Sequence, residues 1–240
     1  MIIDFHTHIG HSHDGSEQTI PELESNMKKL GIDKSVVFSI DDKDMSREEL
    51  SFKIMEDVRG DDSLIPFFRF DPKKMKAENL ERILKDFHGV KLHSRAEDFN
   101  PLDKKFFPLY EAIEKSGKPL LFHTKKYHLK QTDPAEIVRI AEEFPKLKLV
   151  LAHFAGSQPL VFNYVEKNGL GNVYFDTSVN CTQFYIRSIG EKLGFDRILF
   201  GSDCPYSDQE VELLKIKKLE IGDDDKNKIL GLNAKKLLNL

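Results

Sequence analysis

Several features that define whole classes of protein are scarce or missing in this sequence. It has two cysteines, Cys181 and Cys204, too few for a disulfide framework or a cysteine-rich zinc module. Basic residues do not outnumber acidic ones: 36 Lys and Arg stand against 40 Asp and Glu, a formal net charge of −4. Nucleic-acid binders usually carry a concentrated basic surface, so we expect no nucleic-acid partner. No apolar stretch approaches the ~20 residues of a membrane span, so we expect no membrane contact.

Length and composition favour an ordinary globular protein. The chain has 240 residues, a length at which single α/β barrels are common. Its first residues, MIIDFHTH, lack the basic region and the long apolar run of a secretory signal. We therefore expect one domain over residues 1–240, in a reducing, cytoplasmic setting.

Short apolar runs recur along the whole chain at roughly even spacing. Each is rich in Val, Ile, Leu and Phe and lacks regular polar alternation, which is typical of strands covered on both faces. The eight runs are residues 2–5, 35–40, 64–70, 89–92, 119–122, 148–152, 172–175 and 197–201.

The segments between these runs carry the apolar period of amphipathic helices. Ser46 and Asp133 are positioned to cap two of them, and Asn233 is expected to cap a last helix. The helical segments are 46–59, 79–88, 103–116, 133–145, 158–168, 182–193, 208–219 and 223–239. Because strand and helix alternate throughout, the pattern predicts a (β/α)8 barrel, with an open doubly wound sheet as the alternative.

Polar residues follow several of the predicted strands at the point where each ends. His6 and His8 follow the first run, and His123, His153 and Asp203 follow three later ones. In a barrel the carboxyl ends of the strands meet at one rim, where catalytic side chains collect. Residues two apart on a strand share a face, so the imidazoles of His6 and His8 can reach one divalent ion. A single His-x-His motif could be no more than two unrelated polar residues at the end of a strand. Three further metal-ligand residue types at the same rim favour a metal site.

Taken together, these motifs resemble the amidohydrolase superfamily, and within it the branch typified by aminocarboxymuconate-semialdehyde decarboxylase. The matching motifs are IIDFHTH, GVKLH, LLFHT, LVLAHFAG, VYFDTS, ILFGSDCP and GLNAKKLL, which span almost the whole chain. The resemblance implies a (β/α)8 barrel with His6, His8, His123 and Asp203 as metal ligands. It also implies catalytic roles for Asp203, as the group that moves a proton, and for His153, which would contact water or substrate.

Lys91 leaves the number of metal ions open. In binuclear members of the superfamily, a lysine on the fourth strand is carboxylated and bridges two metals. The GVKLH motif, with Lys91 and His93 on one face, resembles instead the branch with one metal and an unmodified lysine. We expect one divalent ion, with zinc favoured and manganese, iron or cobalt open, because nitrogen and oxygen ligands accept all of them. TatD-like deoxyribonucleases carry a Glu where this chain has Lys91, which argues against DNA hydrolysis.

Further residues at the predicted rim are candidates for substrate binding. Arg69 could clamp a substrate carboxylate through its planar guanidinium, and Lys125 could do so as a point charge. His93, Lys91 and Ser178 could also contact the substrate. Each of these residues could instead have a purely structural role, as part of an ion pair, as a solvated loop residue or as a buried group with hydrogen-bond partners in the protein.

Two aspartates and one cysteine complete the predicted rim. Asp4 shares a strand face with His6 if the alternation is regular, and Asp176 directly follows the seventh run, so either could orient a ligand imidazole. Cys204 stands beside Asp203, but no base is placed for it by the sequence. We interpret it as a small buried residue and not as a nucleophile.

The functional prediction favours a metal-dependent hydrolase that uses an activated water on a small-molecule amide, ester or lactone. Decarboxylases of the resembled branch are generally longer, and the modest length of this chain tilts the prediction towards hydrolysis. The first alternative is a non-oxidative, metal-dependent decarboxylase of a small carboxylated substrate. The second is a degenerate barrel that binds a ligand without turnover. The resemblance also makes a homodimer one of the expected assemblies.

Overall fold

The computed structural model describes residues 1–42, 44–125, 132–179 and 181–240. Nine strands form one sheet in the order β2-β1-β3-β4-β5-β6-β7-β8-β9. Eight of them are parallel and match the eight predicted runs: β1 (Ile3–His11), β3 (Lys34–Ser39), β4 (Leu64–Arg69), β5 (Gly89–Leu92), β6 (Leu120–Phe122), β7 (Leu149–Leu151), β8 (Val173–Asp176) and β9 (Ile198–Leu199). The short strand β2 (Glu17–Gln18) pairs antiparallel with the end of β1.

The sheet curls until its last strand meets its first. The backbone N–H of Phe5 donates to the carbonyl of Phe200 at 2.8 Å, and that of His8 donates to the carbonyl of Cys204 at 2.8 Å. Thr7 and Cys204 also form a parallel bridge. These contacts close the sheet, which confirms the predicted (β/α)8 barrel and excludes the open doubly wound alternative.

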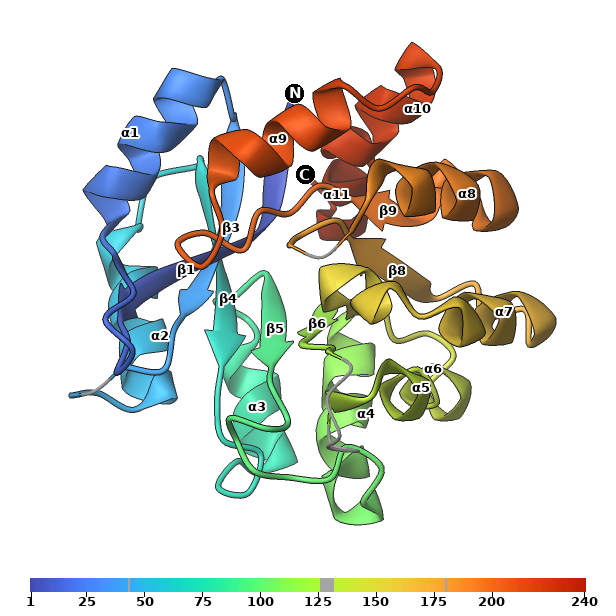
Figure 1. Ribbon diagram of the computed structural model, residues 1–240. Helices are drawn as coiled ribbons and strands as arrows, with labels where there is room; N and C mark the ends of the chain where they lie inside the picture. The colour runs from blue at the N-terminus through green and yellow to red at the C-terminus, as the bar shows by residue number, and fades with distance from the viewer. Residues whose placement is uncertain (43, 126–131, 180) are drawn as a thin grey trace.

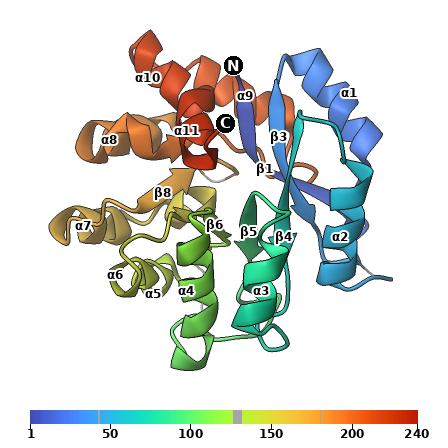
Figure 2. The same ribbon diagram turned by 180° about the vertical axis from the view of Figure 1, so that it is seen from behind.

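Helices surround the curled sheet, as Figures 1 and 2 show from opposite sides. They are α1 (Ile20–Leu30), α2 (Arg47–Asp57), α3 (Ala77–Ile83), α4 (Phe107–Ser116), α5 (Pro134–Ile137), α6 (Ile140–Glu143), α7 (Pro159–Lys167), α8 (Gln183–Leu193), α9 (Gln209–Lys217), α10 (Asp223–Asn227) and α11 (Asn233–Leu238). Shorter helical turns are η1 (Lys104–Phe106), η3 (Ala152–Ser157), η4 (Phe195–Arg197) and η5 (Lys228–Leu232). Within the described ranges, no helix has the length and apolar character that a bilayer crossing requires.

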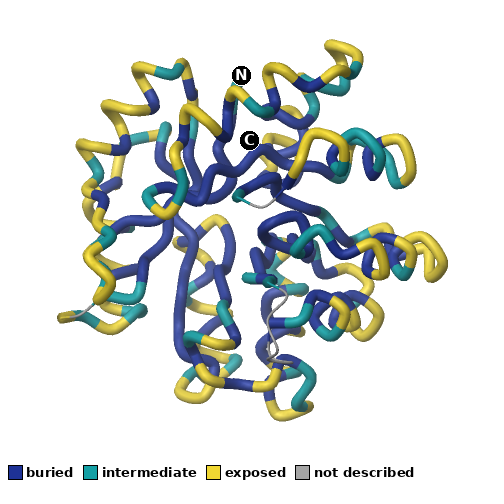
Figure 3. The backbone as a smooth tube through the Cα atoms, in the orientation of Figure 1, coloured by how far each residue is buried: buried dark blue, intermediate teal, exposed yellow. Residues whose placement is uncertain are grey.

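The apolar core has two parts, one on each face of the sheet. The larger part lies between the strands and the outer helices, where both partners contribute buried Leu, Ile, Val and Phe. The smaller part includes Phe5, Phe38 and Phe67 from the strands together with Leu237 and Leu238 of α11. Figure 3 shows the buried residues concentrated along the strands and the exposed ones on the outer helices. This two-sided burial explains why the strands lack polar alternation.

Helix α1 was absent from the predicted segments, although its sequence carries clear start and stop signals. Thr19 and Glu22 form a capping box at its start. Leu23 and Met27, four residues apart, are its buried side chains, and Gly31 ends it in a left-handed conformation with φ 71°. The predicted helix 46–59 is confirmed as α2, with Ser46 as its cap. The predicted helix 133–145 is divided into α5 and α6, and Asp133 caps the first of them.

The expectation that Asn233 caps the last helix is wrong. Helix α11 continues directly from η5, so Asn233 has helical backbone angles and needs no cap. Its side-chain amide instead donates to the carbonyls of Phe195 and Ile198, both at 2.8 Å. The residue therefore ties the C-terminal helix to the strand β9.

Candidate functional site

A cavity of about 430 Å³ opens at the carboxyl ends of the strands. Its lining includes the four imidazoles of His8, His93, His123 and His153 together with the carboxylate of Asp203. These residues follow or end β1, β5, β6, β7 and β9, so the fold gathers them from five separate strands. The sequence placed all of them at one rim, and the structure brings them to one cavity.

A bulge in β1 determines which of its side chains face the cavity. Asp4 pairs with Ser35 but Thr7 pairs with Val37, so β1 has one extra residue between those two pairs. Ile3, before the bulge, and Phe5, within it, both belong to the apolar cluster inside the barrel. The bulge breaks the two-residue alternation, and beyond it His6 and His8 approach Asp203.

Asp4 does not share the face of His6, because the bulge lies between them. Its carboxylate accepts the backbone N–H of His6 at 3.1 Å and that of Ser202 at 2.9 Å, and the side chain of Gln209 at 2.8 Å. Burial raises the pKa of Asp4 to about 6, although these hydrogen bonds oppose the shift. Asp4 therefore holds the backbone under the site and does not orient an imidazole.

The segment after β9 brings Asp203 to the two histidines. The backbone N–H of Asp203 donates to the carbonyl of His6 at 2.7 Å, and Asp203 has a left-handed φ of 65°. Its Oδ1 lies 3.0 Å from Nε2 of His6 and 2.9 Å from Nε2 of His8. Ligand atoms of these three residues all lie within 4.8 Å of one another, and all three are buried.

Asp176, at the end of β8, orients the ring of His6. Its Oδ2 accepts from Nδ1 of His6 at 2.9 Å, and its Oδ1 accepts the backbone N–H groups of His153 at 3.1 Å and Ser178 at 3.0 Å. Burial raises the pKa of Asp176, but His6, His153 and the hydrogen bonds outweigh it and lower the pKa well below its usual range. Because Nδ1 of a neutral His6 carries the donated proton, its Nε2 has a lone pair aimed at Asp203.

This donor set fits a divalent cation. Nε2 of His6 and the carboxylate oxygen of Asp203, 3.0 Å apart, need a proton or a cation between them. Burial and Lys91 lower the pKa of His6, but Asp176 and Asp203 outweigh them and raise it, so a divalent cation would compete with a proton for this nitrogen. Burial, against the opposing effect of Asp203, lowers the pKa of His8 to about 3, so its ring is neutral at pH 7 and can act as a ligand. The pKa of Asp203 lies well below its usual range, because His6 and His153 outweigh the effect of burial. Two neutral imidazoles and one carboxylate are ligands that zinc, manganese and related ions accept.

His123 and His93 form a separate part of the cavity wall. Their rings stack at 3.6 Å between centroids and 8° between planes. Nδ1 of His123 lies 3.1 Å from Nε2 of His153, and His123 is not part of the three-residue cluster of His6, His8 and Asp203. Burial lowers the pKa of His123 and of His93 well below the ordinary value, so both rings are neutral. The role of His123 as a ligand therefore stays a prediction.

His153 occupies an unusual backbone segment. It begins a left-handed turn in which residues 153–157 all have positive φ, with φ 55° and ψ 37° at His153 itself. Such a conformation costs about 1–2 kcal/mol for each residue other than glycine. Strain of this kind collects at functional sites, where the surrounding structure holds it in place. Here the turn directs Nδ1 of His153 to Oγ of Ser178 at 2.9 Å.

Lys91 lies beside the cluster and not at the open rim. It is almost fully buried, with Nζ 3.1 Å from Nε2 of His6 and 4.8 Å from the ring centre of Phe38. Burial lowers the pKa of Lys91 to about 8 against the opposing effect of Asp203 and Asp176. The choice between one and two metal ions therefore stays a prediction.

Of the predicted substrate-binding residues, Arg69 lines the cavity, but its guanidinium is already engaged by the protein, and its contact with substrate stays a prediction. Its guanidinium donates to Glu97 at 2.9 and 3.1 Å, to Asp41 at 3.0 Å and to the carbonyl of Ser39 at 3.0 Å. Ser178 is fully buried and hydrogen-bonded to His153 and Asp176, which places it behind the cavity. Lys125 does line the cavity.

The sequence reasoning missed Arg95, Asp41 and Tyr206, which also line the cavity. Arg95 and Asp41 follow β5 and β3 by a few residues, so their position after a strand was the available signal. Tyr206 follows Asp203 closely, and its ring packs edge-on against that of His8 at 5.1 Å. Asp14, in the loop after β1, reaches the cavity as well.

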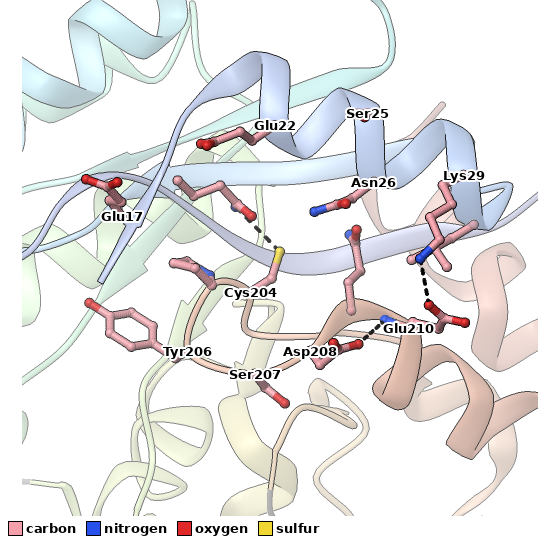
Figure 4. A pocket seen from close by; sticks show the side chains of 14 residues that line it. Glu17, Glu22, Ser25, Asn26, Lys29, Cys204, Tyr206, Ser207, Asp208 and Glu210 are labelled. Atoms are coloured by element: carbon pink, nitrogen blue, oxygen red, sulfur yellow. Dashed lines mark hydrogen bonds and ion pairs between the residues drawn. The ribbon is translucent and has the colours of Figure 1, made fainter. Parts of the chain in front are cut away.

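A second, larger hollow of about 590 Å³ lies outside the barrel mouth, between α1 and the start of α9 (Figure 4). Its charged side chains serve the local structure. Glu22 and Asp208 cap the two helices, and Lys29 pairs with Glu210 at 3.0 Å. Cys204 at its edge is buried, and burial raises the pKa of its thiol to about 12, which leaves no thiolate at pH 7. This hollow therefore offers no chemistry of its own.

Solved structures with the same fold extend over the whole chain. A 5-carboxyvanillate decarboxylase from Sphingomonas paucimobilis is 17% identical with a TM-score of 0.79, and the match covers 100% of this chain and 99% of that one. A 2,6-dihydroxybenzoate decarboxylase from Rhizobium is 15% identical with a TM-score of 0.82, covering 99% and 98%. A dihydroxybenzoic acid decarboxylase from Polaromonas, with bound manganese and an inhibitor, is 16% identical with a TM-score of 0.76, covering 100% and 97%.

These comparisons correct the functional prediction. The prediction of hydrolysis as the main activity is contradicted, because the three enzymes described above, which share this fold from end to end, are named as decarboxylases. The length argument that tilted the prediction also fails, since this chain spans 97% or more of each of those chains. The alternative drawn from the sequence is the better supported one.

The family itself is shown directly by the sequence. A family model described as amidohydrolase matches residues 3–240, which is nearly the whole chain. The match includes every strand of the barrel and the segment that carries Asp203. The chain therefore belongs to the amidohydrolase family, and it is an enzyme of that superfamily.

Proposed function

We propose that the protein is a non-oxidative decarboxylase that acts on a small carboxylated substrate with one divalent metal ion. The observation that carries the proposal is the buried cluster of His6, His8 and Asp203 beside an open cavity. Enzymes with this fold that are named for 5-carboxyvanillate and 2,6-dihydroxybenzoate support the reaction class. The manganese in the Polaromonas enzyme supports a divalent ion, with zinc among the alternatives.

His6, His8 and Asp203 would hold the ion, and the neutral ring of His123 is the candidate for a further ligand. When bound, a divalent cation supplies a Lewis acid that polarises an oxygen of the substrate. Asp176 fixes the tautomer of His6 so that Nε2 keeps its lone pair. Asp4 holds the backbone of His6 at 3.1 Å and so keeps the bulge of β1 in place.

Decarboxylation exchanges a carboxylate on carbon for a proton. The carbon–carbon bond breaks, its electron pair stays on the remaining carbon and takes up the proton, and carbon dioxide leaves. Oδ1 of Asp203 faces the two imidazoles, and Oδ2 lies 4.0 Å from Nδ1 of His153. Oδ2 is therefore the atom placed to relay a proton: the low pKa of Asp203 keeps it ionised at pH 7, so it would take a proton from water and pass it to the carbon.

His153 is placed to hold the substrate as this proton moves. Burial, partly offset by Asp203, lowers the pKa of His153 to about 4, so its ring is neutral at pH 7. A neutral ring offers one donor and one acceptor nitrogen, and its orientation is set by Ser178 at 2.9 Å. Arg95 and Lys125 supply positive charge at the cavity wall for a substrate carboxylate.

The test is a substrate panel assayed with the metal-loaded protein in D2O. Candidates are 2,6-dihydroxybenzoate, 5-carboxyvanillate and related carboxylated phenols, each with manganese or zinc. We expect release of carbon dioxide and one deuterium at the carbon that lost the carboxylate. Asp203→Asn and His6→Ala should abolish both, whereas Asp57→Asn on the outer surface should retain them. Turnover that survives Asp203→Asn, or a panel without carbon dioxide release, would overturn the proposal.

A further inference from the structure

Glu97 is a buried carboxylate that lies between two arginines and the wall of the cavity. It is 2% exposed. Its Oε1 accepts from Nη2 of Arg69 at 2.9 Å and from Nε of Arg69 at 3.1 Å, and Nε of Arg47 lies 3.2 Å away. Both arginines also contact Asp41, at 3.0 and 2.7 Å. The network joins the ends of β3 and β4 to the loop after β5.

The other oxygen of Glu97 holds the loop that carries His93. Oε2 accepts the backbone N–H of His93, and the backbone N–H of Glu97 donates to the carbonyl of His93 at 2.9 Å. The N–H of Ala96 donates to Nδ1 of the His93 ring at 3.3 Å, and Arg47 donates to the carbonyl of Ala96 at 2.8 Å. Backbone and ring of His93 are therefore both held within residues 93–97, and the network anchors that loop to β4.

The ring of His93 links the position of residues 93–97 to the wall of the cavity. Its Nδ1 accepts a hydrogen bond, so the neutral ring carries its proton on Nε2. The ring stacks on His123 at 3.6 Å, and His123 contacts His153 at 3.1 Å. A displacement of residues 93–97 would thus move two imidazoles of the cavity wall together.

We propose that Glu97 is a positioning residue that fixes the rings of His93 and His123 at the cavity wall. Arg69, expected from the sequence to bind substrate, acts here as the anchor of Glu97. A purely structural ion pair would account for the contacts with Arg69 and Arg47, but it would not require the second oxygen to hold the backbone of His93. The effect on turnover rests on the proposed decarboxylation, whereas the position of the rings does not.

The test compares Glu97→Gln with a matched control, Glu166→Gln. Glu166 is 53% exposed and pairs with Lys192 at 2.8 Å on the outer surface. Ring signals of His93 and His123 are recorded by NMR on 15N-histidine-labelled, zinc-loaded protein, and assigned with His93→Gln and His123→Gln. In wild-type protein and in the control, both signals should carry the upfield shift of stacked rings. In Glu97→Gln both should move towards unstacked positions, because an amide has one acceptor oxygen, so its NH2 must face either the guanidinium groups or the backbone N–H of His93.

Kinetics on the best substrate of the panel supply the second readout. We expect KM of Glu97→Gln to rise about 10-fold with little change in kcat, because misplaced wall residues weaken substrate positioning. The number of zinc ions bound should equal that of wild type, because His6, His8 and Asp203 are unchanged. A panel without turnover would count against decarboxylation only, since the ring signals still test the position of His93.

A second variant keeps the inference testable if Glu97→Gln fails to fold. Arg47 is 25% exposed, and Arg47→Ala removes one contact to Glu97 and the bond to the Ala96 carbonyl while Arg69 stays. The same two ring signals should move in the same direction by a smaller amount. Folded Glu97→Gln or, failing that, Arg47→Ala with wild-type ring signals would overturn the inference.

Discussion

Replacing Asp176 by Asn tests whether Asp176 holds His6 in the tautomer that can bind a cation. The carboxylate accepts four hydrogen bonds: Oδ2 from the ring of His6, and Oδ1 from two backbone N–H groups and the hydroxyl of Ser178. An amide has one acceptor atom and one donor group. If its oxygen faces His6, the ring keeps its tautomer but loses the carboxylate charge that makes it a stronger ligand, and the NH2 faces the backbone N–H groups of His153 and Ser178. If it is reversed, the NH2 forces the proton of His6 onto Nε2, and the lone pair is lost.

Both orientations carry a cost of known size. Loss of a group that orients a metal ligand typically lowers affinity about 10–100-fold, or ~1.4–2.7 kcal/mol. Unpartnered buried N–H groups cost about 1–3 kcal/mol of folding free energy. We therefore expect Asp176→Asn to bind the ion at least about 10-fold more weakly and to unfold at lower urea concentration.

Metal affinity is measured by competition with a chelator of known affinity, and folding free energy by urea unfolding in excess chelator. The control is Asp57→Asn, which removes an exposed ion pair with Lys53 and should change either quantity little. Asp176→Asn with wild-type metal affinity would refute the argument that the tautomer of His6 prepares the site. Loss of stability without loss of affinity would refute it equally.

Three further predictions concern stability. With chelator present, acidification from pH 6.5 to about 4 should lower the free energy of unfolding by at most ~1.4 kcal/mol per pH unit for each of His8 and His153. The folded pKa values of these two rings, about 3 and about 4, lie below that of a histidine in the unfolded chain, so the unfolded chain takes up protons first. Urea unfolding at both pH values should show a smaller loss of stability in His153→Gln than in wild type, and an equal loss would contradict this. Asn233→Ala removes two buried hydrogen bonds to carbonyls and should cost about 1–3 kcal/mol in the same assay, whereas an unchanged midpoint would exclude the role in tying α11 to β9. Gly89→Ala would place a Cβ in a clash with the ring of Phe67 and should cost about 1–3 kcal/mol of folding free energy; a variant as stable as wild type would show that this ring moves freely.

The barrel was predictable because its cause is local and repeats. Eight apolar runs match eight parallel strands, since a strand buried on both faces must be apolar throughout. Capping signals at Ser46 and Asp133 placed two helix starts correctly. The signals at Thr19 and Gly31 were equally clear and would have placed α1.

The site was predictable in its members but not in its contacts. Residues that follow the strands were predicted to lie at one end of the barrel, and this prediction grouped His6, His8 and Asp203 correctly. It does not indicate what each side chain touches once the strands are curled. Arg69 was expected to meet substrate, and its partners Asp41 and Glu97 come from segments 28 residues away on either side.

The sequence alone determined the fold class, the family and the rim at which the chemistry collects, because periodicity and strand-end position depend only on neighbours along the chain. The tertiary structure decided which imidazole faces which oxygen. The extra residue in β1 changes the faces of the strand beyond Phe5, and the return of the chain after β9 places the carboxylate of Asp203 within 3.0 Å of the rings of His6 and His8. The bulge and the position of Asp203 both depend on contacts between segments far apart in the sequence. These contacts form only when the sheet closes into a barrel.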